Sequence, residues 1–126
     1  MSATAMAQVR PTRRFEIGFE SENCATVVSV SGEIDMATAP QLERALLAAE
    51  QERNGLVLDL QGVGFLDSTA LHVLLRASER LNERGRVLHV VCGQGPVRRL
   101  FELTVLTATF RIHSDRDAAT LEVGHS

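Results

Sequence analysis

Three polar side chains, Asp67, Ser68 and Thr69, stand together between an apolar segment and an amphipathic one. The apolar segment is residues 56–60, and a short glycine-containing loop at residues 61–64 follows it. Aspartate is a preferred helix-capping residue, so the two hydroxyls fall in the first turn of the next helix. A helix N-terminus tolerates added negative charge. Plain capping accounts for the aspartate, but the exposed hydroxyls favour a site that receives a phosphate from another protein.

Three other kinds of chemistry fit this sequence less well. Asp59 lies in an apolar strand, as a phospho-acceptor aspartate would, but the acidic pair and the lysine that such a site requires are absent. Gly93 and Gly95 lack the third glycine of a nucleotide-binding loop, and a tight turn explains them. Ser68 lacks a Gly-x-Ser-x-Gly turn, and His72 on the same helix is badly placed to act as its base. We therefore predict that the protein is not an enzyme.

The cysteines and the remaining candidate ligands are far apart in the sequence. Cys24 and Cys92 form neither a Cys-x-x-Cys pair nor a zinc-type spacing with histidine, so we expect free thiols in a reducing cytoplasm. The strands expected to carry them are parallel, which places the thiols at opposite ends of the sheet. His89 in mid-strand and His113 near the end of the last strand are expected to be structural. The sequence predicts no metal and no cofactor.

Composition and charge indicate one globular domain. The chain has 126 residues, of which 44% are hydrophobic and 23% charged, and its net charge of −3 argues against nucleic-acid binding. All 13 basic residues are arginine, which excludes a phosphate-binding or Schiff-base lysine. The sequence has no apolar segment of the length of a signal peptide or a membrane span. We expect a cytoplasmic protein that does not bind membranes.

The hydrophobic patterns predict the element order β-β-α-β-α-β-α-β-α. Strands are expected near residues 15–19, 25–31, 56–60, 87–92 and 110–113. The first helix is expected to begin at Thr38, with Gln41 completing a capping box. Strand–helix–strand units predict parallel pairing, and the first two strands predict an antiparallel hairpin. The sequence therefore predicts an α/β domain at residues 13–123, with a mixed sheet of four to five strands and about four helices, between a flexible arm (1–12) and a tail (124–126).

The helix that follows Asp67 is amphipathic over residues 68–84. Its predicted core face consists of Leu71, Leu74, Leu75, Ser78 and Leu81. His72 and Arg76 lie on its predicted solvent face. Val73 and Ala77 border that face, and we expect this apolar edge to contact a partner.

Three segments occur in order along the chain: Gly-Glu-Ile-Asp at 32–35, Phe-Leu-Asp-Ser-Thr at 65–69 and Pro-Val-Arg-Arg-Leu-Phe-Glu-Leu at 96–103. With the Thr-x-x-Gln-Leu start of the first helix, they resemble bacterial anti-sigma factor antagonists, which are built on the STAS domain. In that family, an anti-sigma factor that is also a serine kinase phosphorylates the serine after the aspartate, and a PP2C-type phosphatase removes the phosphate. The resemblance implies that Ser68 is the acceptor. The family usually has glycine where this chain has Ala70.

The resemblance also implies a contact surface for the anti-sigma factor around this serine. The predicted partner-binding residues are Asp35, Met36, Asp67, Ser68, Thr69, His72, Val73 and Arg76. Binding without phosphate would release a sigma factor, and phosphorylation of Ser68 would prevent binding. The alternative is a fixed STAS subunit of a transporter-associated or stressosome-like assembly, without a phosphorylation switch. Whether Thr69 is a second acceptor stays open.

Overall fold

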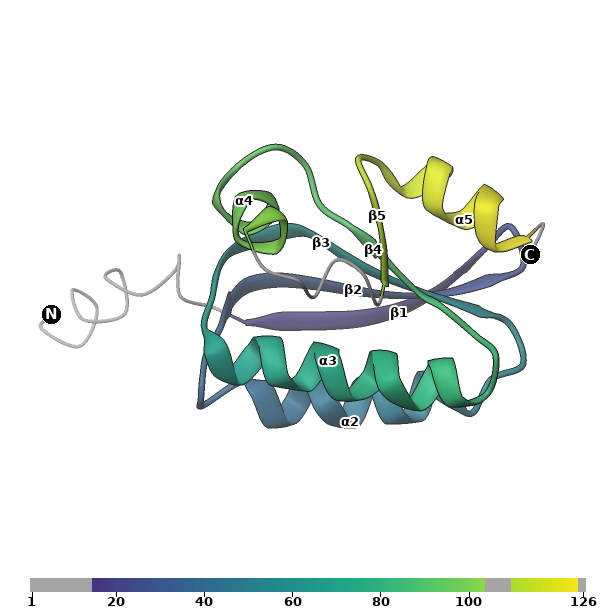
Figure 1. Ribbon diagram of the computed structural model, residues 1–126, viewed down its shortest axis with the longest axis horizontal. Helices are drawn as coiled ribbons and strands as arrows, with labels where there is room; N and C mark the ends of the chain where they lie inside the picture. Colours follow the sequence, from purple (N-terminus) through teal and green to yellow (C-terminus); the bar gives the residue numbers. More distant parts are fainter. Residues whose placement is uncertain (1–14, 104–109, 125–126) are drawn as a thin grey trace, which may run out of the picture.

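The computed structural model describes residues 15–103 and 110–124, and its centre is a five-stranded mixed sheet (Figure 1). The strands are β1 (Glu16–Glu22), β2 (Ala25–Ile34), β3 (Gly55–Leu66), β4 (Leu88–Val91) and β5 (Phe110–His113). They lie side by side in chain order. The β1–β2 pair is antiparallel and the other three pairs are parallel. The predicted α/β class and N-terminal hairpin are confirmed.

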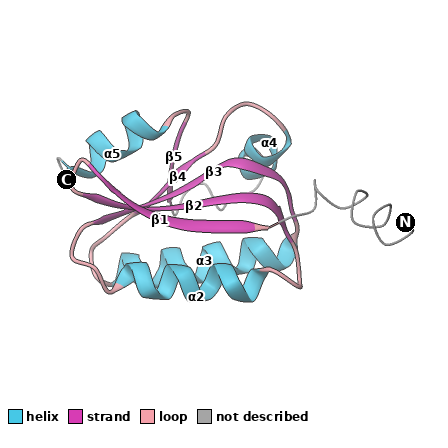
Figure 2. Cartoon of the chain, turned by 180° about the vertical axis from the view of Figure 1, so that it is seen from behind, coloured by secondary structure: helices cyan, strands magenta, loops and turns pink. Residues whose placement is uncertain are grey.

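Helices cover both faces of the sheet (Figures 1 and 2). They are α2 (Ala39–Glu50), α3 (Ser68–Glu83), α4 (Pro96–Glu102) and α5 (Arg116–Gly124). The pair α2 and α3 lies on one face, α5 packs on the other, and α4 lies at the end of the sheet where α3 begins. A large aliphatic core fills the space next to α2 and α3, and a smaller cluster lies under α5. None of the helices in the described part of the chain has the length and apolarity of a membrane span.

Ion pairs join α2 to α3. Arg76 donates two hydrogen bonds to the Glu43 carboxylate, at 2.7 and 3.2 Å, and Arg80 donates two to that of Glu50, at 2.8 and 2.7 Å. Arg80 also lies 3.7 Å from Glu43, so that the four side chains form one network. The hydrogen bond from Arg76 lowers the pKa of Glu43, which keeps that carboxylate ionised. Glu50 is buried, and the two bonds from Arg80 compensate for its lost hydration.

The turn between β1 and β2 consists of Asn23 and Cys24, which have φ angles of 52° and 66°. Two positive φ angles in a two-residue hairpin loop are the signature of a type I′ turn. Cys24 is exposed at this turn, whereas Cys92, after β4, is buried, and burial raises the pKa of its thiol. Both cysteines are free, as predicted.

Strand β3 is longer than the sequence pattern predicts. Residues 61–64, which we expected to form a loop, belong to the strand; Gly62 and Val63 pair with Ser31 and Gly32 of β2, and the register shifts before and after them. Gly62 permits this approach, because a Cβ atom there would lie 2.8 Å from the Cβ of Ser31. The Asp59 carboxylate accepts a hydrogen bond of 2.9 Å from the N–H of Gln61, which stabilises the irregular step. The loop prediction is wrong because glycine here permits close packing of two strands instead of a turn.

The orientation of α3 also differs from the prediction. Val73 and Ala77, which we expected at an exposed edge, have exposed fractions of 2% and 0%. Helical periodicity places them on the same side as Arg76 and Arg80, which contact α2. Because α3 packs against both the sheet and α2, its buried face is rotated from the predicted one: Val73 and Ala77 are buried, whereas Leu71 and Leu75 of the predicted core face are only partly buried. Val73 is a core residue, and its assignment to the partner-binding surface is wrong.

Helix α2 begins without the predicted capping box. The Thr38 hydroxyl makes no capping bond to the helix; it donates to the carbonyl of Glu33 (3.0 Å) and accepts from the N–H of Asp35 (2.9 Å). The carboxylate of Asp35 accepts hydrogen bonds from the N–H groups of Ala37 (2.9 Å) and Thr38 (3.2 Å). Asp35 therefore holds the turn before α2, a role that the pattern had given to Thr38 and Gln41.

Both ends of the predicted domain fall at the margins of the described residues. The arm at residues 1–12 and residues 125–126 of the tail lie outside them, so the domain limits stay predictions. The last helix begins after Asp115, whose carboxylate accepts a hydrogen bond from the N–H of Ala118 (2.8 Å). It extends through Gly124, one residue into the predicted tail.

Because β3 approaches β2 closely, alanine substitutions at two nearby glycines, Gly62 and Gly64, are expected to change the stability of the protein differently. We expect Gly62→Ala to lower the free energy of unfolding by about 1–3 kcal/mol, because its methyl group would overlap Ser31. Gly64→Ala is the matched control, since a Cβ atom there would have no described atom within 4 Å beyond its chain neighbours. Urea unfolding of both variants measures the difference. Equal stabilities would contradict the pairing of residues 62–63 with β2.

Candidate functional site

Asp67 anchors the start of α3 in two directions. Its carboxylate accepts a hydrogen bond from the N–H of Ala70 (3.1 Å), which caps the helix. Its own N–H donates to the carbonyl of Ile34 (3.1 Å), which continues the ladder between β2 and β3. Because Ser68 follows directly, the sheet fixes its backbone position. The capping role predicted for Asp67 is confirmed.

Ser68 and Thr69 occupy the first turn of α3. Ser68 is exposed, whereas Thr69 is partly buried. The unpaired N–H groups of a first helical turn stabilise a nearby negative charge by about 0.3–1 kcal/mol. The Ser68 hydroxyl is therefore more accessible to an approaching protein than the Thr69 hydroxyl.

Ala70 stands where the resemblance drawn from the sequence leads us to expect glycine. It is completely buried and belongs to the main core cluster. Its methyl group therefore packs inside the protein and does not contribute to the surface around Ser68. The substitution changes core packing and leaves the approach to the hydroxyl open.

The loop between β2 and α2 lies beside the start of α3, because Ile34 and Leu66 are paired at the ends of neighbouring strands. Met36 in this loop is 75% exposed, and Phe65 near the end of β3 is 51% exposed. Large exposed apolar side chains next to an exposed serine are typical of a docking surface. Phe65 is not among the residues that the sequence predicted for this surface. Extending β3 to Leu66 would have shown that Phe65 and Leu66 face opposite sides of the sheet.

His72 and Arg76 continue the exposed side of α3 away from Ser68. Both are exposed, and the side chain of Arg76 is 50% accessible. Its hydrogen bonds to Glu43 raise the pKa of Arg76 and hold the guanidinium group over α2. A partner that binds here would therefore contact the Arg76 guanidinium group in a position that Glu43 already holds.

The structure places the loop after β2 beside the start of α3, whereas His72 and Arg76 lie further along that helix. Of the predicted partner-binding residues, Asp35 and Met36 come from the loop after β2, and the rest come from the start and outer side of α3. Those that are at least partly exposed are Asp35, Met36, Asp67, Ser68, Thr69, His72 and Arg76. The surface has two exposed apolar residues, one exposed hydroxyl and charged residues at its border, an arrangement that fits protein binding.

Comparison with family models gives a match over residues 19–119, from β1 into α5, to the STAS domain. This chain belongs to the STAS domain family. The matched region of this STAS protein includes both segments of the candidate site, the loop after β2 and the whole of α3.

Proteins similar to this STAS protein include anti-sigma factor antagonists. It is 37% identical over 100 residues to the anti-sigma-F factor antagonist RsfB of Mycobacterium tuberculosis, covering 78% of this chain and 81% of the relative. It is 32% identical over 80 residues to the anti-sigma-B factor antagonist of Staphylococcus aureus, covering 63% and 74%. A crystal structure of an anti-sigma factor antagonist from Mycobacterium paratuberculosis shares its fold with a TM-score of 0.80 at 38% identity, covering 88% of this chain and 95% of that one. The resemblance predicted from the sequence is confirmed.

Substitutions at Asp67 test its anchoring role in the isolated protein. We expect Asp67→Ala to lower the free energy of unfolding by about 0.5–2 kcal/mol, because the N–H of Ala70 loses its acceptor. Asp67→Asn is the matched control, since its amide oxygen still accepts that bond. Urea or thermal unfolding of the two variants checks this. An alanine variant as stable as the asparagine variant would show that the cap contributes nothing.

Proposed function

We propose that this STAS protein is an anti-sigma factor antagonist controlled by phosphorylation of Ser68. Without phosphate it binds an anti-sigma factor and thereby releases a sigma factor; with phosphate it does not bind. The anti-sigma factor is also the serine kinase, and a PP2C-type phosphatase restores the binding form, all in the cytoplasm. The role itself is non-catalytic. The observation that carries the proposal is an exposed Ser68 hydroxyl at a helix start that the sheet holds in place.

The proposed contact surface surrounds this hydroxyl. Met36 and Phe65 supply exposed apolar area, and His72 and Arg76 extend the surface along α3. Interfaces between proteins commonly combine an apolar centre with a polar rim. Ser68 lies among these groups, so the proposed modification falls inside the surface that the partner would cover.

A phosphate on Ser68 would change the charge of this surface. It adds about −1.5 to −2 charges and three acceptor oxygens. The helix N-terminus stabilises that charge by about 0.3–1 kcal/mol, while the nearby carboxylates of Asp35 and Asp67 oppose it. A partner surface suited to a neutral hydroxyl would have to desolvate the phosphate, and each 1.4 kcal/mol lost weakens binding about tenfold.

We do not expect the added phosphate to change the conformation of the fold. Asp67 ties the start of α3 to the sheet, and the arginine–glutamate network ties its outer side to α2. In this proposal the switch acts by changing the binding surface and not by rearranging the helices.

The Ser68 variants separate binding from modification. We expect Ser68→Asp to bind the cognate anti-sigma factor at least tenfold more weakly, because its carboxylate places negative charge inside the interface. Ser68→Ala should retain binding and lose the phosphate adduct, whereas Thr69→Ala should keep the adduct. Calorimetry measures the affinities, and intact mass after incubation with ATP and the anti-sigma factor measures the adduct. Equal affinities of Ser68→Asp and Ser68→Ala would reject the switch and support a fixed STAS subunit.

Two variants, each with serine in place of an exposed apolar residue, test where the partner binds. We expect Met36→Ser to weaken binding of the anti-sigma factor at least fivefold without lowering the melting temperature, because Met36 is 75% exposed. Leu121→Ser is the matched control: Leu121 is 50% exposed but lies in α5, on the opposite face of the sheet. If the control loses affinity and Met36→Ser does not, the interface lies on the α5 side.

A further inference from the structure

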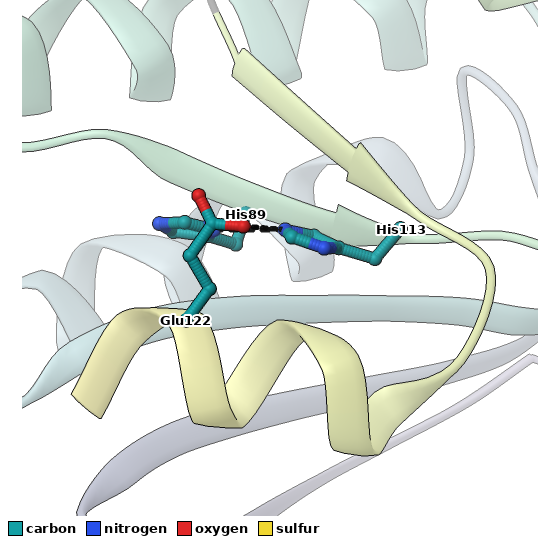
Figure 3. A group of neighbouring side chains, drawn as sticks. All are labelled: His89, His113 and Glu122. Atoms are coloured by element: carbon teal, nitrogen blue, oxygen red, sulfur yellow. Dashed lines mark hydrogen bonds and ion pairs between the residues drawn. The ribbon is translucent and has the colours of Figure 1, made fainter. Parts of the chain in front are cut away.

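Three side chains that could bind a metal ion meet on the α5 side of the sheet, away from Ser68. His89 comes from β4, His113 from the end of β5 and Glu122 from α5, and Figure 3 shows the three converging. In the parallel β4–β5 ladder, His113 pairs with Val91, two residues from His89, so the two rings lie on the same face of the sheet. The rings are stacked, with centroids 5.2 Å apart. The sequence analysis, which assigned both histidines structural roles, gave no sign of this arrangement.

The ligand atoms have the spacing of a small metal site. Nδ1 of His89 lies 3.0 Å from Nε2 of His113, and that Nε2 lies 3.8 Å from Oε1 of Glu122. One ligand atom from each residue lies within 4.8 Å of the others. Ligands held about 2.1 Å from a tetrahedral zinc ion are about 3.4 Å apart. Small rotations of the side chains would therefore bring all three onto one ion.

Two ring nitrogens that face each other at 3.0 Å must share a hydrogen atom, since a neutral imidazole has one donor and one acceptor nitrogen. A metal ion can bind the lone pairs of both nitrogens once the donor ring has moved its hydrogen to its other ring nitrogen by tautomerisation. Neutral imidazole is the form that binds metal.

The cluster is within reach of solvent. His89 and Glu122 line a cleft of about 340 Å³, together with Val87 and Arg111. His89 itself is buried, but the Glu122 side chain is 40% exposed. An ion can therefore enter from the side of Glu122, and a water molecule can occupy a fourth ligand position.

We propose that His89, His113 and Glu122 form a binding site for a divalent transition-metal ion, with zinc as the best match. Two imidazoles and one carboxylate suit zinc and its neighbours in the first transition row, whereas magnesium and calcium prefer oxygen ligands alone. With three protein ligands, the ion keeps one position for water or an anion. The site is independent of the proposed phosphorylation switch.

Arg111 orients one ligand of this site, but its positive charge also opposes a bound metal ion. It lies 3.3 Å from Oε2 of Glu122, which orients the carboxylate so that Oε1 is directed to His113. Such a contact to a ligand fixes its geometry. Arg53 and Arg86 also line the cleft, and these cations oppose a bound metal ion. We therefore expect weaker binding than in a structural zinc site with cysteine ligands.

A bound ion would join three elements at once. It would link β4, the edge strand β5 and the last helix. In the metal-free protein, the hydrogen bond between the two histidines and the hydrogen bond from Arg111 to Glu122 already join these elements, and His113 lies 3.8 Å from Glu122. Because the native fold assembles these ligands, the ion would stabilise it in proportion to its occupancy.

Zinc titration of the full chain, freed of metal with a chelator, tests the proposal. We expect one zinc ion per chain by calorimetry, a higher melting temperature with zinc, and visible absorption typical of four-coordinate cobalt when Co²⁺ is the probe. Glu122→Gln and His113→Gln should each weaken zinc binding at least tenfold. Glu122 is partly exposed, so its variant tests the site without removing a core residue.

Three control variants remove other potential ligands. His72→Gln and Cys24→Ser change exposed residues outside the cluster, and His125→Gln changes the remaining histidine of the chain. All three should bind zinc as the unchanged protein does. Zinc binding that survives Glu122→Gln and His113→Gln, or that is lost in a control variant, would overturn the proposal. So would a protein that binds no zinc while its circular dichroism shows the native fold.

Discussion

The pairing of β2 with β3 is the interaction on which the candidate site depends. It extends along both strands, continues past the irregular step at Gly62, and ends with the hydrogen bond from Asp67 to Ile34. The helix that carries Ser68 starts at the next residue, and the loop that carries Met36 starts at the end of β2. One ladder of backbone hydrogen bonds therefore sets the relative positions of both halves of the proposed contact surface.

The same sheet supports a second surface on its other face. There, the Asp59 carboxylate in β3 accepts a hydrogen bond of 2.9 Å from Arg116 in α5, and Arg116 also contacts Glu20 in β1. This ion pair explains why Asp59 stands in an otherwise apolar strand. From the sequence, Asp59 was only a poor match to a phospho-acceptor aspartate. The histidine cluster lies beneath the same helix, so the proposed protein-binding and metal-binding surfaces are separated by the sheet.

The sequence predicted those features that depend on local patterns. The element order, the hairpin and the cap at Asp67 follow from alternation, helical spacing and residue preference, and all three are present. The features it missed depend on contacts between distant segments. The burial of Val73 requires knowing that α2 lies against α3, and the extension of β3 requires the neighbouring Ser31. The approach of His89 to His113 requires the register of two strands that a helix separates in the chain.

The network of Glu43, Glu50, Arg76 and Arg80 has a consequence for signalling. Several charged hydrogen bonds hold α3 to α2, and the cap residue Asp67 holds the start of α3 to the sheet. The proposed switch at Ser68 would therefore act through surface charge, with no helix rearrangement between modification and response. Each copy would be either available or unavailable to its partner, and the proposed kinase and phosphatase would set the rate of change between the two.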